Sequence, residues 1–382
     1  PGAVDICDNE DNDCDGSTDE DTSQWFTWYF DFDDDGIGTS EMTDTACSQP
    51  SGYVANVGDC DDEDPAVRNG TVSYGDADVD GYGDPADQTV TCTVASGRVF
   101  DNTDCDDSEA LAYPGVAASD SFTDCMLDSD GDGYGDDTVT GDVIAGTDCD
   151  DSDSDVNPVA DEVCDGVDLN CDGVWNVRVP DTCATIQAAL DAGSTGIRGT
   201  VTVAAGTYDE LLDYGNAMVS LIGESGAGNT VVEPSSGYPV LRIDGGQDAE
   251  VVVSGLEISG GYCGASSCIG MGLYVKNSSP TLKDLIISNN IGYTSGNWGG
   301  YGGGVAFISS DSIVMNTLFV DNFADYYGGQ MYIASSSDIT LYNVEFVDGG
   351  TYGTQATGYG GGIAVGSSTK VTGYNVIISG NK

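Results

Sequence analysis

Apolar residues in the second half of the chain fall into short runs that return at a regular spacing. Three runs follow glycine-rich turns and four others end in Asn or Gly turns: Val305–Phe307, Met331–Ile333 and Ile363–Val365, then Leu285–Asn290, Leu318–Asn322, Val344–Gly349 and Val376–Asn381. From Asn290 to Asn322, Gly349 and Asn381 the steps are 32, 27 and 32 residues. A coil of about thirty residues cannot bury its own apolar face, so neighbouring coils must stack on it. The pattern predicts a right-handed parallel β-helix, with the three asparagines in a side-chain ladder that Gly349 breaks.

Earlier in this half the pattern predicts more short strands and one helix. The strands are expected at Thr200–Val203, Val219–Ile222, Thr230–Val232, Val240–Ile243 and Val251–Ile258. Thr185–Ala192 has the spacing of a short amphipathic helix that ends at Gly193. We expect this helix to cover the first coil, whose exposed edge would otherwise pair with another strand.

The first half has a different pattern, in which carboxylates rather than apolar residues recur. Asp128, Asp130 and Asp132 stand at alternate positions before Gly133, as at the start of an EF-hand calcium loop. Four more loops have this pattern: Asp11, Asp13 and Asp15; Asp31, Asp33 and Asp35; Asp76, Asp78 and Asp80; and Asp168, Asn170 and Asp172. The alternation lets three side chains converge on one ion. Flanking helices and a glutamate at the twelfth position are missing, so we expect calcium loops outside an EF-hand fold.

Further oxygen ligands are expected around these loops. The residue after the glycine offers a backbone carbonyl, at Ile37, Tyr82, Tyr134 and Val174. Single carboxylates follow two loops at Asp84 and Asp136. Three D-C-D-D clusters come later, with the acidic residues Asp59, Asp61, Asp62 and Asp64; Asp104, Asp106 and Asp107; and Asp148, Asp150, Asp151 and Asp153. We expect the clusters to bind further metal or to share the ions of the loops.

The two halves also differ in charge. Residues 1–176 hold 48 acidic and 2 basic residues, a net charge of −46, and residues 177–382 hold 18 and 7, a net charge of −11. Such self-repulsion opposes a compact state unless cations neutralise it, and it argues against nucleic acid as a partner. The usual interpretation of an acidic run is a disordered tail, but phased glycines, recurrent cysteines and interleaved aromatic residues oppose it here.

We therefore predict two domains in a mainly β, multidomain chain. Residues 1–176 are expected to form loop-rich, disulfide-linked calcium-binding repeats, in units of about 1–22, 23–70, 71–118 and 119–176. Residues 177–382 are expected to form the β-helix with its short capping helix.

Thirteen cysteines with recurrent spacing predict disulfides and an oxidising, extracytoplasmic compartment. The spacing suggests the pairs Cys7–Cys14, Cys47–Cys60, Cys92–Cys105, Cys125–Cys149, Cys164–Cys171 and Cys263–Cys268. Cys183 is then the odd cysteine. Zinc is the alternative for close cysteine pairs, but the chain has no histidine and is rich in hard oxygen ligands, which favour calcium.

The acidic half resembles known metal-binding repeats. The phrases Cys7–Gly16 and Cys164–Gly173, with the D-C-D-D clusters, resemble the aspartate-rich metal-binding repeats of secreted bacterial proteins related to the MopE type. They are also similar to the calcium-wrapped type 3 repeats of thrombospondins. The resemblance covers roughly residues 1–175 and implies several bound Ca²⁺ ions. The chain departs from the MopE-type copper site, because it has no histidine.

Residues 183–382 resemble pectate-lyase-like β-helix proteins, and their G-G-x and F-x-x-N phrases are similar to those of polymorphic outer-membrane adhesins. This resemblance implies a fold rather than a function. A lyase on this fold needs an Arg or Lys base beside carboxylates, and a glycosidase needs two placed carboxylates. The basic residues are scattered along the sequence without a clustered acidic partner, and the absence of histidine excludes Ser-His and Cys-His catalysis. Asp321 and Asp348 are expected at one position of adjacent coils, where solvated turn residues are the ordinary interpretation.

Aromatic residues gather in the loops between the coils: Tyr293, Trp298, Tyr301, Tyr326, Tyr327, Tyr352 and Tyr359. Stacking of the coils would align them along one edge. They either pack the loops together or offer a contact surface for a glycan or another protein.

These patterns favour a secreted, calcium-binding structural or adhesive protein and not an enzyme, with the acidic repeats as a stiff extension. The alternatives are a β-helix polysaccharide lyase or hydrolase with calcium-binding accessory repeats, and a subunit of an extracellular filament. We expect an extracellular or cell-surface location, self-association or a cell-surface or glycan partner, no nucleic acid and no transmembrane segment. Both ends of the sequence fall inside repeats, so a part of a longer precursor is expected.

Overall fold

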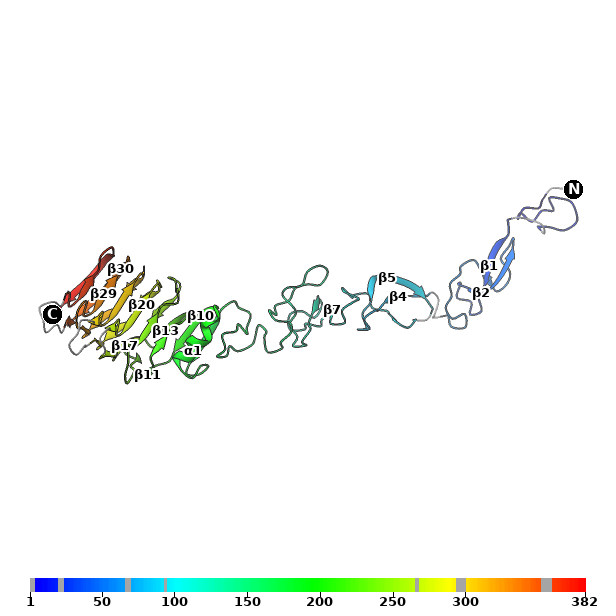
Figure 1. Ribbon diagram of the computed structural model, residues 1–382. Helices are drawn as coiled ribbons and strands as arrows, with labels where there is room; N and C mark the ends of the chain where they lie inside the picture. Colours follow the sequence, from blue (N-terminus) through cyan, green and yellow to red (C-terminus); the bar gives the residue numbers. More distant parts are fainter. Residues whose placement is uncertain are drawn as a thin grey trace. The chain divides into compact units, whose positions relative to one another are not determined.

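The structure is a computed structural model that describes residues 4–19, 24–65, 70–92, 95–264, 268–292, 300–351 and 359–382. The described residues are mainly β, with one short α-helix and one 3-10 turn (Figure 1). The chain divides into two compact units, Pro1–Ser154 and Asp155–Lys382. The second unit therefore includes the loop of Asp168, which the sequence grouped with the acidic repeats.

Three small antiparallel sheets lie in the first unit. Their strands, in sheet order, are β2 (Thr39–Ala46), β1 (Phe26–Phe30) and β3 (Tyr53–Val54); β5 (Asp84–Thr91), β4 (Thr71–Gly75) and β6 (Arg98–Val99); and β7 (Ala112–Pro114) and β8 (Cys125–Leu127). Among the described residues of this unit, only the apolar side chains of Ala112, Ala117 and Met126 are buried. So small a core cannot hold the unit together, which leaves that task to cross-links and ions.

Disulfides join successive modules of this unit and do not close single modules. The described bridges are Cys7–Cys47, Cys60–Cys92 and Cys105–Cys125. The predicted pairs Cys7–Cys14, Cys47–Cys60, Cys92–Cys105 and Cys125–Cys149 are wrong. Spacing misled because the cysteines of the D-C-D-D turns reach forward to a strand of the next module. Cys14 adopts a φ of 62° within its loop and keeps an exposed, free thiol.

The second unit corrects one further pair. Cys164 bonds to Cys183 rather than to Cys171, so Cys183 is not the odd cysteine. The predicted bridge Cys263–Cys268 is confirmed. Cys183 is completely buried beside the helix, a position that places it against the loop before the first coil.

The second unit is a parallel β-helix whose coils add strands to three faces. The first face contains β9 (Trp175–Val179), β10 (Arg198–Val203), β13 (Met218–Gly223), β16 (Val252–Ser254), β21 (Thr281–Lys283), β26 (Ile313–Met315), and the first parts of β30 (Asp338–Val347) and β33 (Lys370–Ser379). The second face contains β11 (Gly206–Tyr208), β14 (Thr230–Val232), β17 (Glu257–Ser259), β22 (Ile286–Ser288), β27 (Leu318–Val320), and the remaining parts of β30 and β33. The third face contains β12 (Leu212–Asp213), β15 (Leu241–Ile243), β20 (Leu273–Lys276), β25 (Val305–Ile308), β29 (Met331–Ala334) and β32 (Ile363–Val365).

Shorter strands stack in the loops between the second and third faces. They are β18 (Tyr262–Cys263), β23 (Ile291–Gly292), β28 (Phe323–Ala324) and β31 (Gly350–Thr351), and the pair β19 (Cys268–Ile269) and β24 (Gly300–Tyr301). Figure 1 shows the resulting stack of coils.

The coils stack in the register that the sequence period predicts. Ile287 pairs with Phe319, Phe319 with Phe346, and Phe346 with Ile378, which confirms the steps of 32, 27 and 32 residues. Ile287, Phe319 and Phe346 are completely buried, and the two phenylalanine rings stack with their centroids 4.8 Å apart. The core is thus a row of apolar side chains inside the coil.

One predicted strand is wrong and the predicted helix is confirmed. The segment Val251–Ile258 forms two strands, β16 and β17, because Gly255 turns the chain between them with a φ of 68°. The helix α1 (Ile186–Ala192) begins after the N-cap Thr185, whose hydroxyl accepts the Ala188 N–H. It is followed by the 3-10 turn η1 (Gly193–Thr195) and packs against β9, β10 and β12.

The asparagine ladder is present, and it does not break where the sequence predicted. Asn290 Nδ2 donates to Asn322 Oδ1 at 2.9 Å, and Asn322 Nδ2 donates to Gln330 Oε1 at 2.6 Å. Gln330 Nε2 in turn lies 3.3 Å from Asn381 Oδ1. Gly349 has no side chain at this turn, and a Cβ there would lie 2.4 Å from the Gln330 side chain. The longer Gln330 side chain therefore fills the step that Gly349 leaves open.

We predict that Asn322→Ala destabilises the β-helix by about 2–4 kcal/mol, because it leaves buried amide groups of Asn290 and Gln330 without partners. Urea unfolding followed by circular dichroism measures this loss. The control is Asn229→Ala, an exposed residue whose amide bonds only the nearby Ser225 carbonyl; its effect should stay within about 0.5 kcal/mol. Equal effects of the two substitutions would show that the ladder is energetically neutral.

Candidate metal centres

Each aspartate loop curls around its own carboxylates. In the loop after β8, Asp128 accepts the N–H groups of Gly131 at 2.7 Å and Gly133 at 3.0 Å, and Asp130 accepts the N–H of Asp132 at 3.1 Å. The loops of Asp31 and Asp168 repeat the bond to the glycine N–H. The backbone thus fixes each carboxylate while leaving oxygen atoms directed into the loop.

The residue after the glycine has one position in four loops. The N–H groups of Ile37, Tyr82, Tyr134 and Val174 each donate to the last carboxylate of their loop, at 2.8 to 2.9 Å. This bond fixes the peptide whose carbonyl the sequence proposed as a ligand.

The D-C-D-D clusters fold back onto the loops. The residue after the first loop aspartate donates its N–H to the last acidic residue of the cluster: Phe32 to Asp62 at 3.1 Å, Ala77 to Asp107 at 2.7 Å, and Ser129 to Asp151 at 2.9 Å. The first acidic residue of each cluster is also buried, at Asp59, Asp104 and Asp148. Asp148 donates its N–H to the Gly135 carbonyl at 2.8 Å, which anchors it to the loop.

Three centres therefore combine a loop with two carboxylates from the following cluster. Oxygen atoms of Asp78, Asp104 and Asp107 lie within 4.8 Å of one another, as do those of Asp76, Asp78 and Asp80. The residues of the three centres are Asp31, Asp33, Asp35, Asp59 and Asp62; Asp76, Asp78, Asp80, Asp104 and Asp107; and Asp128, Asp130, Asp132, Asp148 and Asp151.

Other acidic residues proposed as ligands hold turns. The carboxylates of Asp61, Asp106 and Asp150 accept N–H or hydroxyl groups of the residue two positions later, and Asp64 donates its N–H to the Asp61 carbonyl. Asp153 donates its N–H to the Asp150 carbonyl in the same way. Asp84 accepts the N–H of Ala86 at the start of β5, and Asp136 accepts both groups of Thr138.

Several of the converging carboxylates have a buried oxygen without a hydrogen-bond partner among the described residues. These atoms are the Oδ2 atoms of Asp33, Asp59, Asp78, Asp80, Asp104, Asp130 and Asp148. Buried polar atoms in folded proteins are nearly always paired, and an unpaired one calls for an explanation such as an ion. Carboxylate oxygens gathered around one point are the ligand set that Ca²⁺ takes. The residues present therefore fit a hard divalent cation.

The crowding of these groups raises their pKa values. Burial raises the pKa of Asp148 to about 6, and the nearby Asp132, Asp130 and Asp151 add to the effect. Burial is also the first cause of the raised pKa of Asp80 and Asp104. In the absence of a cation each centre opposes its own ionisation.

The first and last loops have a carboxylate that sequence reasoning missed. Asp5 is completely buried, accepts the Asn12 N–H at 2.8 Å, and lies with Asp11 and Asp13 in one group of oxygens within 4.8 Å. Glu162 accepts the Asn170 N–H at 3.4 Å. Each stands two residues before the first cysteine of its repeat, a signal that aligning the two repeats would have found.

These two carboxylates add to the loop residues that the sequence identified. The loops hold Asp11, Asp13 and Asp15, and Asp168, Asn170 and Asp172.

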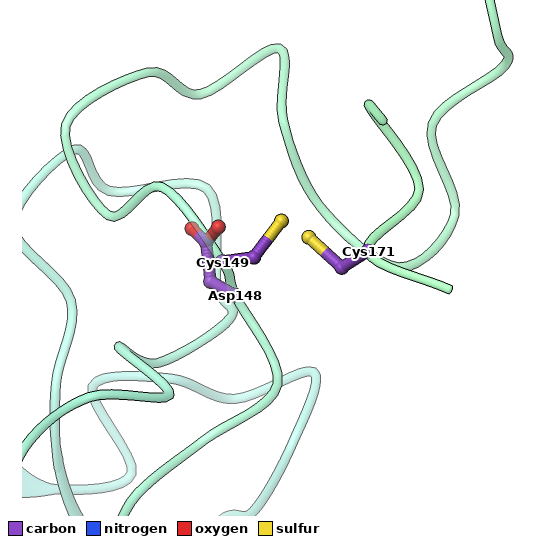
Figure 2. A group of neighbouring side chains, drawn as sticks. All are labelled: Asp148, Cys149 and Cys171. Carbon is purple, nitrogen blue, oxygen red and sulfur yellow. The ribbon is translucent and has the colours of Figure 1, made fainter. Parts of the chain in front are cut away.

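Cysteine does not contribute a thiolate beside Asp148. Figure 2 draws Asp148 with the sulfur atoms of Cys149 and Cys171. Both cysteines are disulfide-bonded, whereas zinc binds the deprotonated thiol. Oxygen is therefore the relevant ligand atom here, as in the other centres.

Four segments of the chain match a family of MopE-type, copper-binding proteins described as "Putative metal-binding motif": residues 1–20, 59–74, 104–137 and 148–175. These segments include Asp5, Asp104, Asp128, Asp148 and Glu162. The N-terminal region thus carries this metal-binding motif. No curated protein matches the chain.

Among solved structures, the chain is similar to the pectin methylesterase from Aspergillus niger in deglycosylated form. The identity is 15%, the match covers 55% of this chain and 87% of that one, and the TM-score is 0.27. The penultimately deglycosylated form of that enzyme matches with the same identity and coverage and a TM-score of 0.25. No described helix has the length and apolar character needed to span a membrane.

We predict that calcium binding releases a proton from Asp148 near pH 6. With a pKa of about 6, this carboxyl is half protonated at that pH, and a cation must displace the proton. By the same linkage the metal-free module is more stable below pH 4 and loses up to about 3 kcal/mol as the pH rises through 6. Proton release measured at pH 6 and pH 8 tests this.

The variants for this test are Asp148→Asn and the control Asp150→Asn, whose carboxylate accepts the Ser152 hydroxyl at the turn. Asp148→Asn should remove the extra proton release at pH 6, and Asp150→Asn should keep it. Equal release by the wild type and Asp148→Asn would refute the assignment of the proton to Asp148.

Proposed function

We propose that this chain is a secreted, calcium-binding structural or adhesive protein and not an enzyme. The observation that carries the proposal is the set of buried, unpartnered carboxylate oxygens, such as Asp104 Oδ2 and Asp148 Oδ2, that converge inside the aspartate loops. A bound cation would satisfy these atoms and remove the repulsion that raises their pKa values.

Calcium is the ion that suits these ligands best. It takes six to eight oxygen ligands in flexible geometry, and centres with five carboxylates and a loop carbonyl supply that number. Magnesium demands a tighter octahedron and keeps its waters. Copper and zinc favour histidine or thiolate ligands, and the chain has no histidine.

The same arrangement supports a mechanical role for the acidic unit. Its apolar core is too small to hold it, and its bridges link one module to the next. Disulfides together with ions at each loop would make a calcium-stapled, stiff extension. The number of disulfides suits an extracellular or cell-surface location, where free calcium matches the affinity of about 10⁻⁴–10⁻³ M typical of extracellular modules.

The aromatic edge of the β-helix supports a contact role. The rings of Tyr301 and Tyr327 stack at 5.6 Å, and those of Tyr327 and Tyr359 at 5.3 Å, on adjacent coils. Tyr359 is 55% exposed. The other aromatic residues expected here, Tyr293, Trp298 and Tyr352, lie outside the described residues. We propose this edge as a surface for self-association, as in a filament, or for a cell-surface glycan.

We predict that the chain binds about five calcium ions, one for each loop, and that their removal by EDTA expands the acidic unit while its disulfides stay intact. Elemental analysis counts the ions, and small-angle X-ray scattering follows the radius of gyration. Asp130→Ala, which removes one loop ligand, should lose one ion and leave the others. A chain without bound calcium whose scattering ignores EDTA would contradict the proposal.

A second candidate function is a carbohydrate-active enzyme on the β-helix. Contrary to the expectation from sequence, basic and acidic side chains do meet there. Arg242 lies 3.2 Å from Asp244 and 3.8 Å from Asp213, and its guanidinium is 5.1 Å from the centre of the Tyr274 ring. These side chains are partly exposed, so water screens their charges.

We predict that the chain produces no new reducing ends from acidic polysaccharides above the level of an Asp244→Asn variant. The reason is that Asp213 and Asp244 are both engaged with Arg242, which leaves no pair of independent acid and base. A reducing-end assay with calcium present measures this. Activity that Asp244→Asn abolishes would replace the structural proposal with the enzymatic one.

A further inference from the structure

Glu162 belongs to the last aspartate loop in space but not in sequence pattern. Its Oε1 accepts the N–H of Asn170 at 3.4 Å. Its Oε2 is buried and has no hydrogen-bond partner among the described residues. Asp168 and Asp172 are near enough to raise the pKa of Glu162, after the larger effect of burial. An acidic oxygen is thus held at the loop with nothing to satisfy it.

The first loop of the chain repeats this placement. Asp5 stands six residues before Asp11, as Glu162 does before Asp168. Asp5 accepts the N–H of Asn12, and Glu162 accepts that of Leu169, the equivalent residue. The two loops lie in different compact units, so the placement is a property of the repeat. Both carboxylates also fall inside segments that match the metal-binding family.

The residues next to Glu162 are anchored to the end of the β-helix. The Val163 carbonyl accepts the indole N–H of Trp175 at 2.9 Å, and Cys164 is bonded to Cys183. Trp175 is completely buried and begins β9, which pairs with β10 of the first coil.

A second contact follows two residues after Cys164. Thr195 donates to the Gly166 carbonyl at 3.0 Å, and a Cβ on Gly166 would lie only 2.1 Å from the carbonyl of Ala192 in α1. Gly166 can approach the helix this closely because it has no side chain. The segment from Glu162 to Gly166 therefore lies directly on the capped end of the β-helix.

We infer that Glu162 is a calcium ligand together with Asp168, Asn170 and Asp172, and that this ion fastens the loop to the first coil of the β-helix. The inference rests on the proposed calcium binding and extends it. Calcium then stabilises the second unit as well as the acidic one, through Val163 and Trp175. Without the ion, repulsion between Glu162, Asp168 and Asp172 loosens the segment that holds the Trp175 ring.

The test compares the full chain with Glu162→Gln and with Asp161→Asn, an exposed neighbour that serves as a matched control. Calcium chloride is the probe. Calcium bound per chain is counted, and amide exchange is measured at β9, Trp175–Val179. In the wild type, calcium at a hundred times its Kd should slow exchange at β9 by about 100-fold where exchange requires release of the ion.

Glu162→Gln should bind one ion fewer and lose the calcium-dependent slowing at β9, while Asp161→Asn behaves as the wild type. Because Gln keeps the acceptor for Asn170, exchange of the variant without calcium should equal that of the wild type without calcium. A Glu162→Gln chain with the full ion count and full slowing would overturn the inference alone. A wild type that binds no calcium would overturn the proposed function as well.

Discussion

Repulsion between gathered carboxylates is the constraint on which the acidic unit depends. Each centre holds its aspartates by bonds from backbone N–H groups, as Gly131 and Gly133 hold Asp128, and these bonds bring like charges together. The raised pKa of Asp148 is the direct consequence. Because apolar burial in this unit is slight, no hydrophobic term can outweigh that repulsion, and a divalent cation is the component that turns it into attraction.

The β-helix is stabilised in the opposite way, by the repetition of neutral contacts. Parallel strands pair coil on coil, and inward side chains such as Phe319 and Phe346 stack in a continuous row. Even its buried polar groups are neutral amides that satisfy one another, from Asn290 through Gln330. The short coil of 27 residues, which carries Gly349, keeps this ladder because Gln330 reaches across the gap.

The sequence predicted the features that repeat locally and missed those that depend on how distant segments meet. The β-helix, α1 and the aspartate loops follow from spacing within a few residues. Val251–Ile258 was taken as one strand because apolar content hid the left-handed turn at Gly255. The bridge Cys60–Cys92 could not be found from spacing, since it depends on the next module lying against the D-C-D-D turn. Glu162 was missed because it lies outside the D-x-N-x-D-G phrase and joins it only through folding.

The two modes of stabilisation meet within residues 155–183 of the second unit. There the bridge Cys164–Cys183 closes a separation of 19 residues, and a cross-link of that size lowers the entropy of the open chain by an amount worth about 3 kcal/mol. The hydrogen bond from Trp175 to Val163 fixes the same segment. The carboxylates of this loop therefore cannot separate far when they repel one another, so less ordering remains for an ion to bring about. A covalent link to a neutral scaffold thus makes a site for a charged ligand, and the ion in turn acts on the scaffold through that link.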